Sequence, residues 1–233
     1  MRKTLCIIAA VACLPLQALA EEYDQAALLR RMIDLDRLAD PPPPGEITGM
    51  FSSYDRKSRI DQAGNQVDWD ANADWGQFIR TEDDGWSVMA EMDGPGVITR
   101  IWSANPSGRI RFILDGQVVI DTPFEDLFNE KLEPFARPLC YIIQDSGGKN
   151  CYFPIGFSQS CKVVIRQSKS YYQINYMLMP DGDQVATFTP QLDESAKEAL
   201  SEVGQAWDGG LDPRKMMRGR SMPTANEVEI KRR

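Results

Sequence analysis

Acidic and aromatic side chains alternate along residues 52–84. Trp69 and Trp75 lie among its many carboxylates, and Trp86 lies two residues beyond it. A sugar ring packs its C–H face on an aromatic ring, while its hydroxyl groups need polar hydrogen-bond partners. The segment therefore predicts a carbohydrate-binding surface, with a solvated acidic loop as the alternative.

Catalysis in this chain would have to use carboxylates, Tyr, Lys or Cys, because the 233 residues include no histidine. This absence excludes Ser–His and Cys–His nucleophiles and zinc sites built on imidazole. A glycosidase needs two carboxylic acids facing one bond, but the spacing of the carboxylates does not select a pair. We assign no catalytic residue. A less favoured alternative is an enzyme of different chemistry that uses Asp55 and acids from residues 61–84.

Oxygen-bearing side chains at alternate positions of residues 68–74 resemble a calcium loop. Ala73 stands where such a loop needs its turn glycine, however, and Ile79 stands where it needs a bidentate Glu. We therefore expect no metal and no cofactor. The net charge of −8, without a basic cluster, argues against nucleic acid and anionic membranes as partners and leaves neutral glycans open.

The N-terminus predicts export. Arg2 and Lys3 precede an apolar run at residues 5–12, and the small-x-small pattern of residues 18–20 precedes a polar chain that starts at Glu21. This is the pattern of a cleavable signal peptide, and the apolar run is too short to span a bilayer. We expect a signal peptide over residues 1–20 and a periplasmic or extracellular protein. Less favoured alternatives are a lipoprotein anchored through Cys13 and a buried N-terminal helix.

Cys140, Cys151 and Cys161 follow the predicted cleavage site. An oxidising compartment permits one disulfide and one free thiol. Three buried free thiols are an equal alternative, and the sequence leaves the pairing open.

Helical periodicity at both ends of the chain frames a central region of short strands. Residues 24–39 predict a helix capped by Asp24, with one apolar face that consists of Ala27, Leu28, Met32, Leu35 and Leu38. The prolines of residues 41–44 end this helix and form a spacer, so residues 21–45 are assigned to helix and spacer. A second helix is predicted over 190–207, before the glycines at 209 and 210.

Residues 49–176 predict many short strands separated by turns. The clearest hairpin turn is Asp115-Gly116, and the predicted strands are 85–92, 96–102, 109–114, 117–120, 140–143, 151–154, 161–166 and 171–176. We expect an all-β fold, a jelly-roll β-sandwich over residues 46–180. Residues 227–231 look like the opening of a further strand, so we assign residues 181–233 to a helix and the start of a missing second sandwich.

Four segments carry a family resemblance: SSYDR at 52–56, DGPGVITRIW at 93–102, NCYFPIGF at 150–157 and YYQINY at 171–176. In this order they resemble the domain of unknown function 2961 family, now glycoside hydrolase family 172. The resemblance implies two jelly-roll sandwiches assembled into trimers or larger rings. It also implies hydrolysis of α-linked fructofuranosides or arabinofuranosides with retention, by a nucleophile carboxylate and an acid/base carboxylate.

The family's two catalytic glutamates lie in Trp-Gly-Glu-Gly-Asp-like and Gly-Thr-Glu-Asp-Tyr-like segments, and neither segment occurs in the 233 residues. We therefore expect the N-terminal portion of a secreted retaining furanosidase from a truncated, split or frame-shifted gene, inactive alone. The alternative is a stand-alone jelly-roll carbohydrate-binding or assembly module. By resemblance, Ser53, Asp55 and Arg56 are assigned to the sugar site, and Asp68 and Trp69 are added from the acidic segment.

Overall fold

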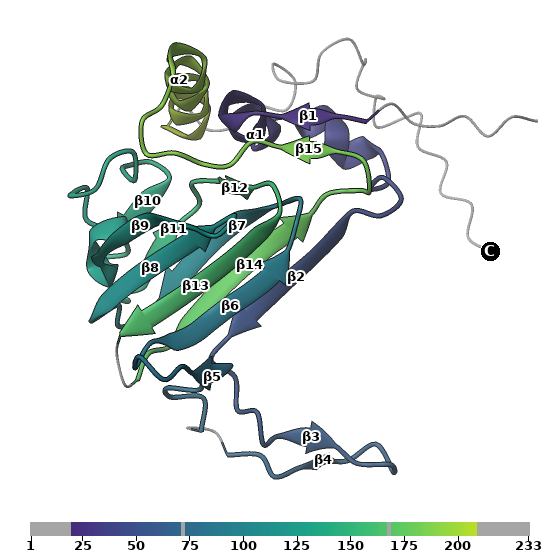
Figure 1. Ribbon diagram of the computed structural model, residues 1–233, viewed down its shortest axis with the longest axis vertical. Helices are drawn as coiled ribbons and strands as arrows, with labels where there is room; N and C mark the ends of the chain where they lie inside the picture. The colour runs from purple at the N-terminus through teal and green to yellow at the C-terminus, as the bar shows by residue number, and fades with distance from the viewer. Residues whose placement is uncertain (1–19, 71–72, 167–168, 209–233) are drawn as a thin grey trace, which may run out of the picture.

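The computed structural model describes residues 20–70, 73–166 and 169–208. Residues 1–19 of the predicted signal peptide, with Cys13, and the strand-like residues 227–231 lie outside these ranges. Within the ranges, helices are too short or too polar to cross a bilayer. The described chain forms two facing sheets with helices at one end (Figure 1).

The two sheets are antiparallel and differ in size. The six-stranded sheet runs in the order β10 (Cys140–Ile142), β11 (Lys149–Cys151), β7 (Gly96–Ser103), β14 (Tyr172–Leu178) and β2 (Ile47–Ser52), and β12 (Ile155–Phe157) also pairs with β7. The five-stranded sheet runs in the order β5 (Arg80–Thr81), β6 (Ser87–Asp93), β13 (Ser160–Arg166), β8 (Arg109–Leu114) and β9 (Gln117–Pro123).

The strand order is that of a jelly roll. With the short strands set aside, the sheets read β11-β7-β14-β2 and β6-β13-β8-β9, so the chain crosses between sheets as two interlocked Greek keys. β13 and β14 lie in different sheets, which makes the turn predicted between them a crossover. The order confirms the predicted jelly-roll sandwich, and it places segments far apart in sequence side by side.

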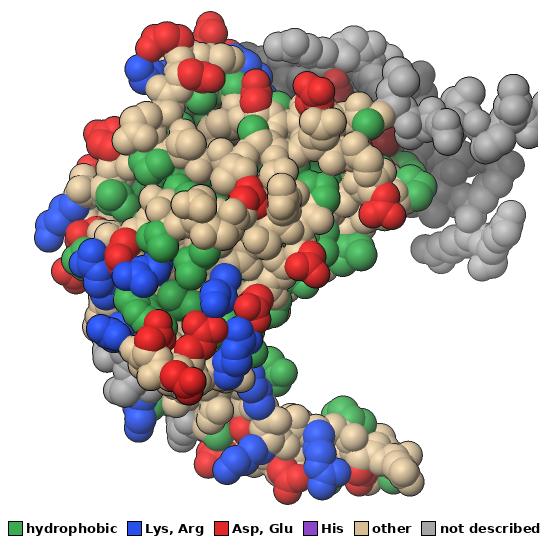
Figure 2. Space-filling view, viewed as in Figure 1, with side chains coloured by type: hydrophobic (Ala, Val, Ile, Leu, Met, Phe, Trp, Pro, Cys, Tyr) green, Lys and Arg blue, Asp and Glu red, His purple; other side chains and the backbone are tan. Residues whose placement is uncertain are grey.

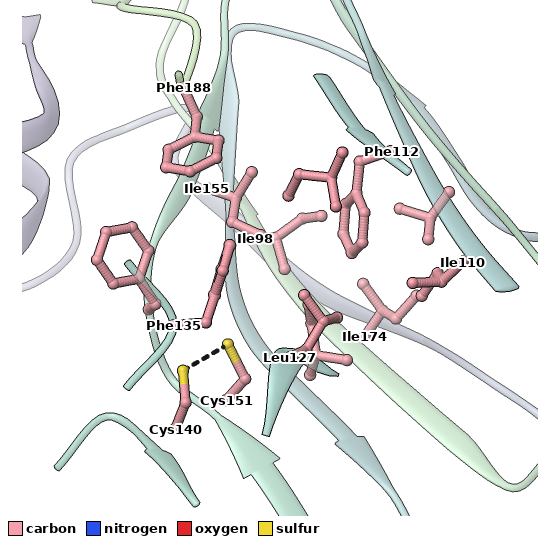
Figure 3. Packing of buried hydrophobic residues seen from close by; sticks show 14 of the residues in the cluster. Ile98, Ile110, Phe112, Leu127, Phe135, Cys140, Cys151, Ile155, Ile174 and Phe188 are labelled. Atoms are coloured by element: carbon pink, nitrogen blue, oxygen red, sulfur yellow. Dashed lines mark hydrogen bonds between the residues drawn. The ribbon is translucent and has the colours of Figure 1, made fainter. Parts of the chain in front are cut away.

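Alternating burial along the strands forms the core between the sheets. In β8 the side chains of Ile110, Phe112 and Leu114 are fully buried, while those between them are more exposed. Successive side chains of a strand point to opposite faces, so one face of each sheet is apolar and one faces outward. Figure 3 shows Ile98, Phe112 and other core side chains packed together.

The predicted Asp115-Gly116 turn joins β8 and β9. Both residues have positive φ, 49° and 78°, as a two-residue type I′ hairpin requires. Asp115 also accepts hydrogen bonds from the backbone amides of Gln159 and Ser160 at 2.6 and 2.9 Å. The turn thus fixes the neighbouring chain as well as its own hairpin.

The N-terminal helix is shorter than predicted. α1 spans Gln25–Arg31, with Asp24 as its cap, and a 3₁₀ helix, η1, follows at Leu35–Ala39. Asp34 accepts a hydrogen bond from the backbone amide of Asp36 and so starts a new turn instead of continuing the helix. Leu38 is 81% exposed, so its predicted place on the apolar face was wrong.

The second helix, α2, spans Glu194–Asp208 and begins later than predicted because Asp193 caps it. α1 and α2 lie beside each other at one end of the sandwich, next to β1 (Glu22–Tyr23) and β15 (Gln184–Val185) (Figure 1). A short 3₁₀ helix, η2 (Phe124–Leu127), follows β9.

A hairpin of β3 (Arg59–Ile60) and β4 (Gln66–Val67) projects from the other end of the sandwich (Figure 1). We call residues 57–70 the arm.

Candidate functional site

The predicted site residues fall in two places. Ser53, Asp55 and Arg56 follow β2 at the root of the arm, whereas Asp68 and Trp69 follow β4 on the arm itself. The structure thus brings the first three together and leaves the last two on a projecting hairpin.

Ser53 and Arg56 bind backbone atoms. The backbone amide of Ser53 donates to the Tyr172 carbonyl oxygen at 3.2 Å, and Ser53 Oγ accepts from the Tyr172 amide at 3.3 Å. Arg56 donates to the carbonyl oxygens of Gln77 at 2.8 Å and of Ser52 at 3.0 Å. Both side chains therefore position the junction between β2, β14 and the segment after the arm.

Only one of the two carboxylate oxygens of Asp55 accepts a hydrogen bond in the described chain. Its side chain is buried, and its Oδ1 accepts from the Lys57 amide at 3.1 Å. Its Oδ2 is buried without a hydrogen-bond partner in the described chain. A buried polar atom without a partner carries a desolvation cost, and Oδ2 is closed off from solvent in this structure.

On the arm, Asp68 and Trp69 face solvent. Asp68 Oδ2 accepts from Arg59 Nε at 3.0 Å in an exposed ion pair. Trp69 is 62% exposed, so its ring is free to cover an apolar surface.

The three tryptophans of the acidic segment do not form one surface. The Trp75 ring packs against Tyr171 at 4.5 Å, and Trp86 is buried on the five-stranded sheet beneath Arg111. The carboxylates do not gather at one place either. Asp61, for example, accepts hydrogen bonds from the backbone amides of residues 63 and 65 in its own turn. No cluster of three possible metal ligands exists in the described ranges, and Asn72 of the calcium-like pattern lies outside them.

A different cluster, which the sequence did not reveal, lies on the six-stranded sheet. Arg100 of β7 donates to Gln173 Oε1 at 2.8 Å and to Asn175 Oδ1 at 3.5 Å, both on β14. Its other terminal nitrogen donates to Asn150 Oδ1 of β11 at 3.1 Å. The guanidinium carbon also lies 5.8 Å from the centre of the Tyr152 ring.

The strand register places this cluster on the outward face of the sheet. Ile101 pairs with Ile174, and both are fully buried in the core. The alternation of side chains then directs their neighbours outward. Arg100 and Asn175 form one outward pair, while Trp102 lies opposite Gln173 on one side and Asn150 on the other. We call the side chains of Arg100, Trp102, Asn150, Tyr152, Gln173 and Asn175 the arginine–amide face.

All three hydrogen-bond partners of Arg100 are uncharged. A guanidinium only donates, so the three amide groups turn their oxygens toward it. Asn150 is buried. No ion pair within the described residues involves Arg100. The face thus combines a cation without a carboxylate partner, amide donors and aromatic rings.

The outward face of the five-stranded sheet is different. Arg80 pairs with Glu91 at 2.6 Å, Lys162 with Glu82 at 3.0 Å, and the chain shows mixed acidic and basic side chains on this side (Figure 2). The hydrogen bond from Arg80 holds the pKa of Glu91 below its ordinary value. Charges on this face are therefore already paired with one another.

A cavity adjoins the arginine–amide face. It measures about 170 Å³, and its lining includes Leu28 and Arg31 of α1, Thr99, Tyr152 and Met177. Pockets that enclose small ligands usually measure roughly 300–1,000 Å³. The cavity is therefore smaller than pockets that enclose a whole small ligand.

A family model described as the GH172 first beta-sandwich domain matches residues 44–196. No curated protein matches the chain. The matched residues contain β2 through β15 and every residue of the arginine–amide face.

Proposed function

Since the chain belongs to glycoside hydrolase family 172, through its first β-sandwich domain, we propose that it is the sugar-binding sandwich of a secreted retaining furanosidase. The substrates that the family resemblance supports are α-linked fructofuranosides and arabinofuranosides. The arginine–amide face would bind the sugar through its amide donors and aromatic rings.

The Arg100 network is the observation that carries this proposal. It joins three of the four segments on which the resemblance rests, since Arg100, Asn150 and Gln173 come from residues 93–102, 150–157 and 171–176. Sugar hydroxyls need several hydrogen-bond partners next to an aromatic ring. Tyr152 supplies such a ring, and it lies 6.4 Å from Tyr141 in a stacked arrangement.

Ser53, Asp55 and Arg56, the residues first assigned to the sugar site, all hydrogen-bond to backbone atoms around the root of the arm. They would support the site by positioning this backbone. Asp68 and Trp69 would contact a longer glycan at the arm.

The catalytic carboxylates would come from a second sandwich. The glutamate-bearing segments implied by the resemblance do not occur among the 233 residues, and retaining hydrolysis needs both a nucleophile and an acid/base carboxylate. We propose that the 233-residue chain binds furanosides but does not hydrolyse them on its own.

The direct test is a calorimetric titration of the purified chain with arabino-oligosaccharides, fructo-oligosaccharides and, as a control, a cellulose-derived oligosaccharide. We expect binding to one of the two furanoside classes and none to the control. An aryl α-arabinofuranoside assay on the same sample should show no turnover. Equal binding to all three sugars, or binding to none, would contradict the proposed sugar specificity.

Export is part of the proposal and rests on the pattern of residues 1–20. Fractionation of cells that express the chain should recover it in the periplasm or medium. Recovery of the full-length chain in the cytoplasm alone would reject export without bearing on sugar binding.

An assembly function is the second candidate, favoured by the apolar side chains of the arm. Ile60 is 66% and Trp69 62% exposed, and Tyr54 at the root of the arm is 58% exposed. Clusters of exposed large apolar side chains mark interaction sites, and another copy of the chain would be the partner. Light scattering should then show a trimer or larger ring that Trp69→Ser dissociates. A monomeric parent chain would reject this candidate.

A further inference from the structure

Two buried thiols face each other across neighbouring strands. Cys140 of β10 lies directly opposite Cys151 of β11, and their Sγ atoms are 3.1 Å apart. Both side chains are fully buried. Figure 3 shows the pair at the edge of the core, near Phe135.

The backbone at this pair matches a disulfide. The Tyr152 amide donates to the Leu139 carbonyl, and the Ile143 amide donates to the Gly148 carbonyl, each next to the β10–β11 ladder. Hydrogen-bonded and non-hydrogen-bonded pairs alternate along an antiparallel ladder, so Cys140 and Cys151 form a non-hydrogen-bonded pair. Such pairs have Cα atoms about 4.5 Å apart, within the range of roughly 4.4–6.8 Å that disulfides span.

Cys161 has a different setting. It lies on β13 in the other sheet, where it pairs with Met92 and Leu114. Its side chain is buried, and burial raises the pKa of the thiol to about 12. Neither residue opposite Cys161 is a cysteine, so Cys161 has no cross-strand thiol with which to pair.

We propose that Cys140 and Cys151 form a cross-strand disulfide and that Cys161 stays a free thiol. The oxidant is a disulfide, either a small molecule such as oxidised glutathione or a protein disulfide. One thiolate attacks it and releases a thiol, and the second thiolate displaces the other half. The two cysteines lose two protons and two electrons, and the oxidant becomes two thiols.

The burial of the pair indicates when this exchange takes place. Burial, together with the hydrogen bond to Cys151, raises the pKa of Cys140 well above its ordinary value. Exchange needs a thiolate and access for the oxidant. The bond should therefore form before the sandwich closes, and it should then resist reductants in the folded protein.

Peptide mapping tests the pairing directly. Trypsin leaves Cys151 and Cys161 in one peptide, residues 150–162, so the experiment uses the Cys161→Ala variant. Unfolded protein is refolded with a mixture of reduced and oxidised glutathione, blocked with iodoacetamide and digested. We expect residues 132–149 joined to residues 150–162, lighter than the two reduced peptides by two hydrogens. Recovery of both peptides only as alkylated thiols would overturn the proposal.

The thermal midpoint of unfolding distinguishes a disulfide from two thiols that are only packed closely together. The thermal midpoint of the oxidatively refolded chain should be higher than that of the same chain refolded with a reductant. The Cys161→Ala variant should keep this difference, and the Cys140→Ala/Cys151→Ala double variant should lose it. A midpoint that is independent of the refolding redox state in the parent chain, or a difference that survives in the double variant, would also overturn the proposal. Neither result depends on sugar binding.

Discussion

Arg100 carries a permanent charge among neutral amides, and this combination gives the outward face of the six-stranded sheet its chemistry. Its side chain is held from two sides, by Gln173 and Asn175 on β14 and by Asn150 on β11. A guanidinium fixed in this way attracts electron-rich oxygen atoms. It also orients the three amides, so that a sugar would meet donors that are already in place.

The ionisation of Asp115 should contribute to the stability of the fold. Burial acts to raise the pKa of its carboxyl, but hydrogen bonds from Thr187 and from the amides of residues 158–160 outweigh burial and hold the pKa below its ordinary value of 3.8. A depressed pKa stabilises the fold above the unfolded-state value, and this contribution disappears as the pH falls through the folded-state pKa.

Asp115→Asn should therefore lower the free energy of unfolding at pH 7 by about 1.5–3 kcal/mol, the range for hydrogen bonds to a charged group. The difference from the parent chain should shrink as the pH falls from about 4 through the lower folded-state pKa of Asp115, because below that pKa both proteins carry an uncharged side chain. Urea unfolding at several pH values measures it. A difference that stays constant down to acid pH would mean that the Asp115 charge contributes nothing.

At the scale of elements, α1 and α2 form a unit against one end of the sandwich. Leu29 of α1 is fully buried, as is Ala199 of α2, and Arg30 pairs with Glu202 at 2.8 Å. The ion pair is partly exposed, and such pairs contribute little to stability because water and salt screen them. The apolar contact should therefore dominate the docking of the two helices.

Leu29→Ala should reduce the free energy of unfolding by about 2–5 kcal/mol, as for other buried leucines. Leu38→Ala is the matched control, because Leu38 lies in η1 and is 81% exposed; it should change stability by less than about 0.5 kcal/mol. Chemical denaturation of both variants measures the contrast. An equal loss of unfolding free energy in both variants would contradict the exposed position of Leu38 in this structure.

Local signals in the sequence predicted the elements well where one short segment decides its own conformation. Asp115-Gly116 forms the predicted hairpin turn, since both residue types tolerate the positive φ that this turn needs. Asp24 caps the first helix as predicted. The helix over residues 24–39 was predicted too long. Its apolar spacing continues past Arg31, but the side chain of Asp34 competes with the helix by capping a new turn.

At the scale of the whole molecule, the jelly roll brings distant segments together. β7 and β14 are neighbours although β13 and several other strands separate them in sequence. Arg100 thereby reaches Gln173 and Asn175, and no local pattern could have indicated this contact. Three of the segments that carry the family resemblance meet at Arg100, which the sequence alone did not show.

The tryptophans of the acidic segment are close in sequence but separate in the fold. Trp75 and Trp86 are close in sequence, yet Trp86 is buried on the five-stranded sheet while Trp75 packs against Tyr171, which precedes β14 of the other sheet. Nearness in sequence therefore predicted a common surface that the fold does not make. The sandwich instead has one outward face of paired charges and one of arginine, amides and aromatic rings.

The affinity of matched arginine variants for furanoside oligosaccharides tests this account most directly. Arg100→Met removes the guanidinium from the arginine–amide face, and Arg109→Met removes one from the five-stranded sheet, where Arg109 pairs with Asp121. Once thermal unfolding shows both variants to be folded, Arg100→Met should weaken binding at least tenfold, which is about 1.4 kcal/mol. Arg109→Met should bind like the parent chain. Unchanged affinity in a folded Arg100→Met, or an equal loss in both variants, would contradict sugar binding at this face.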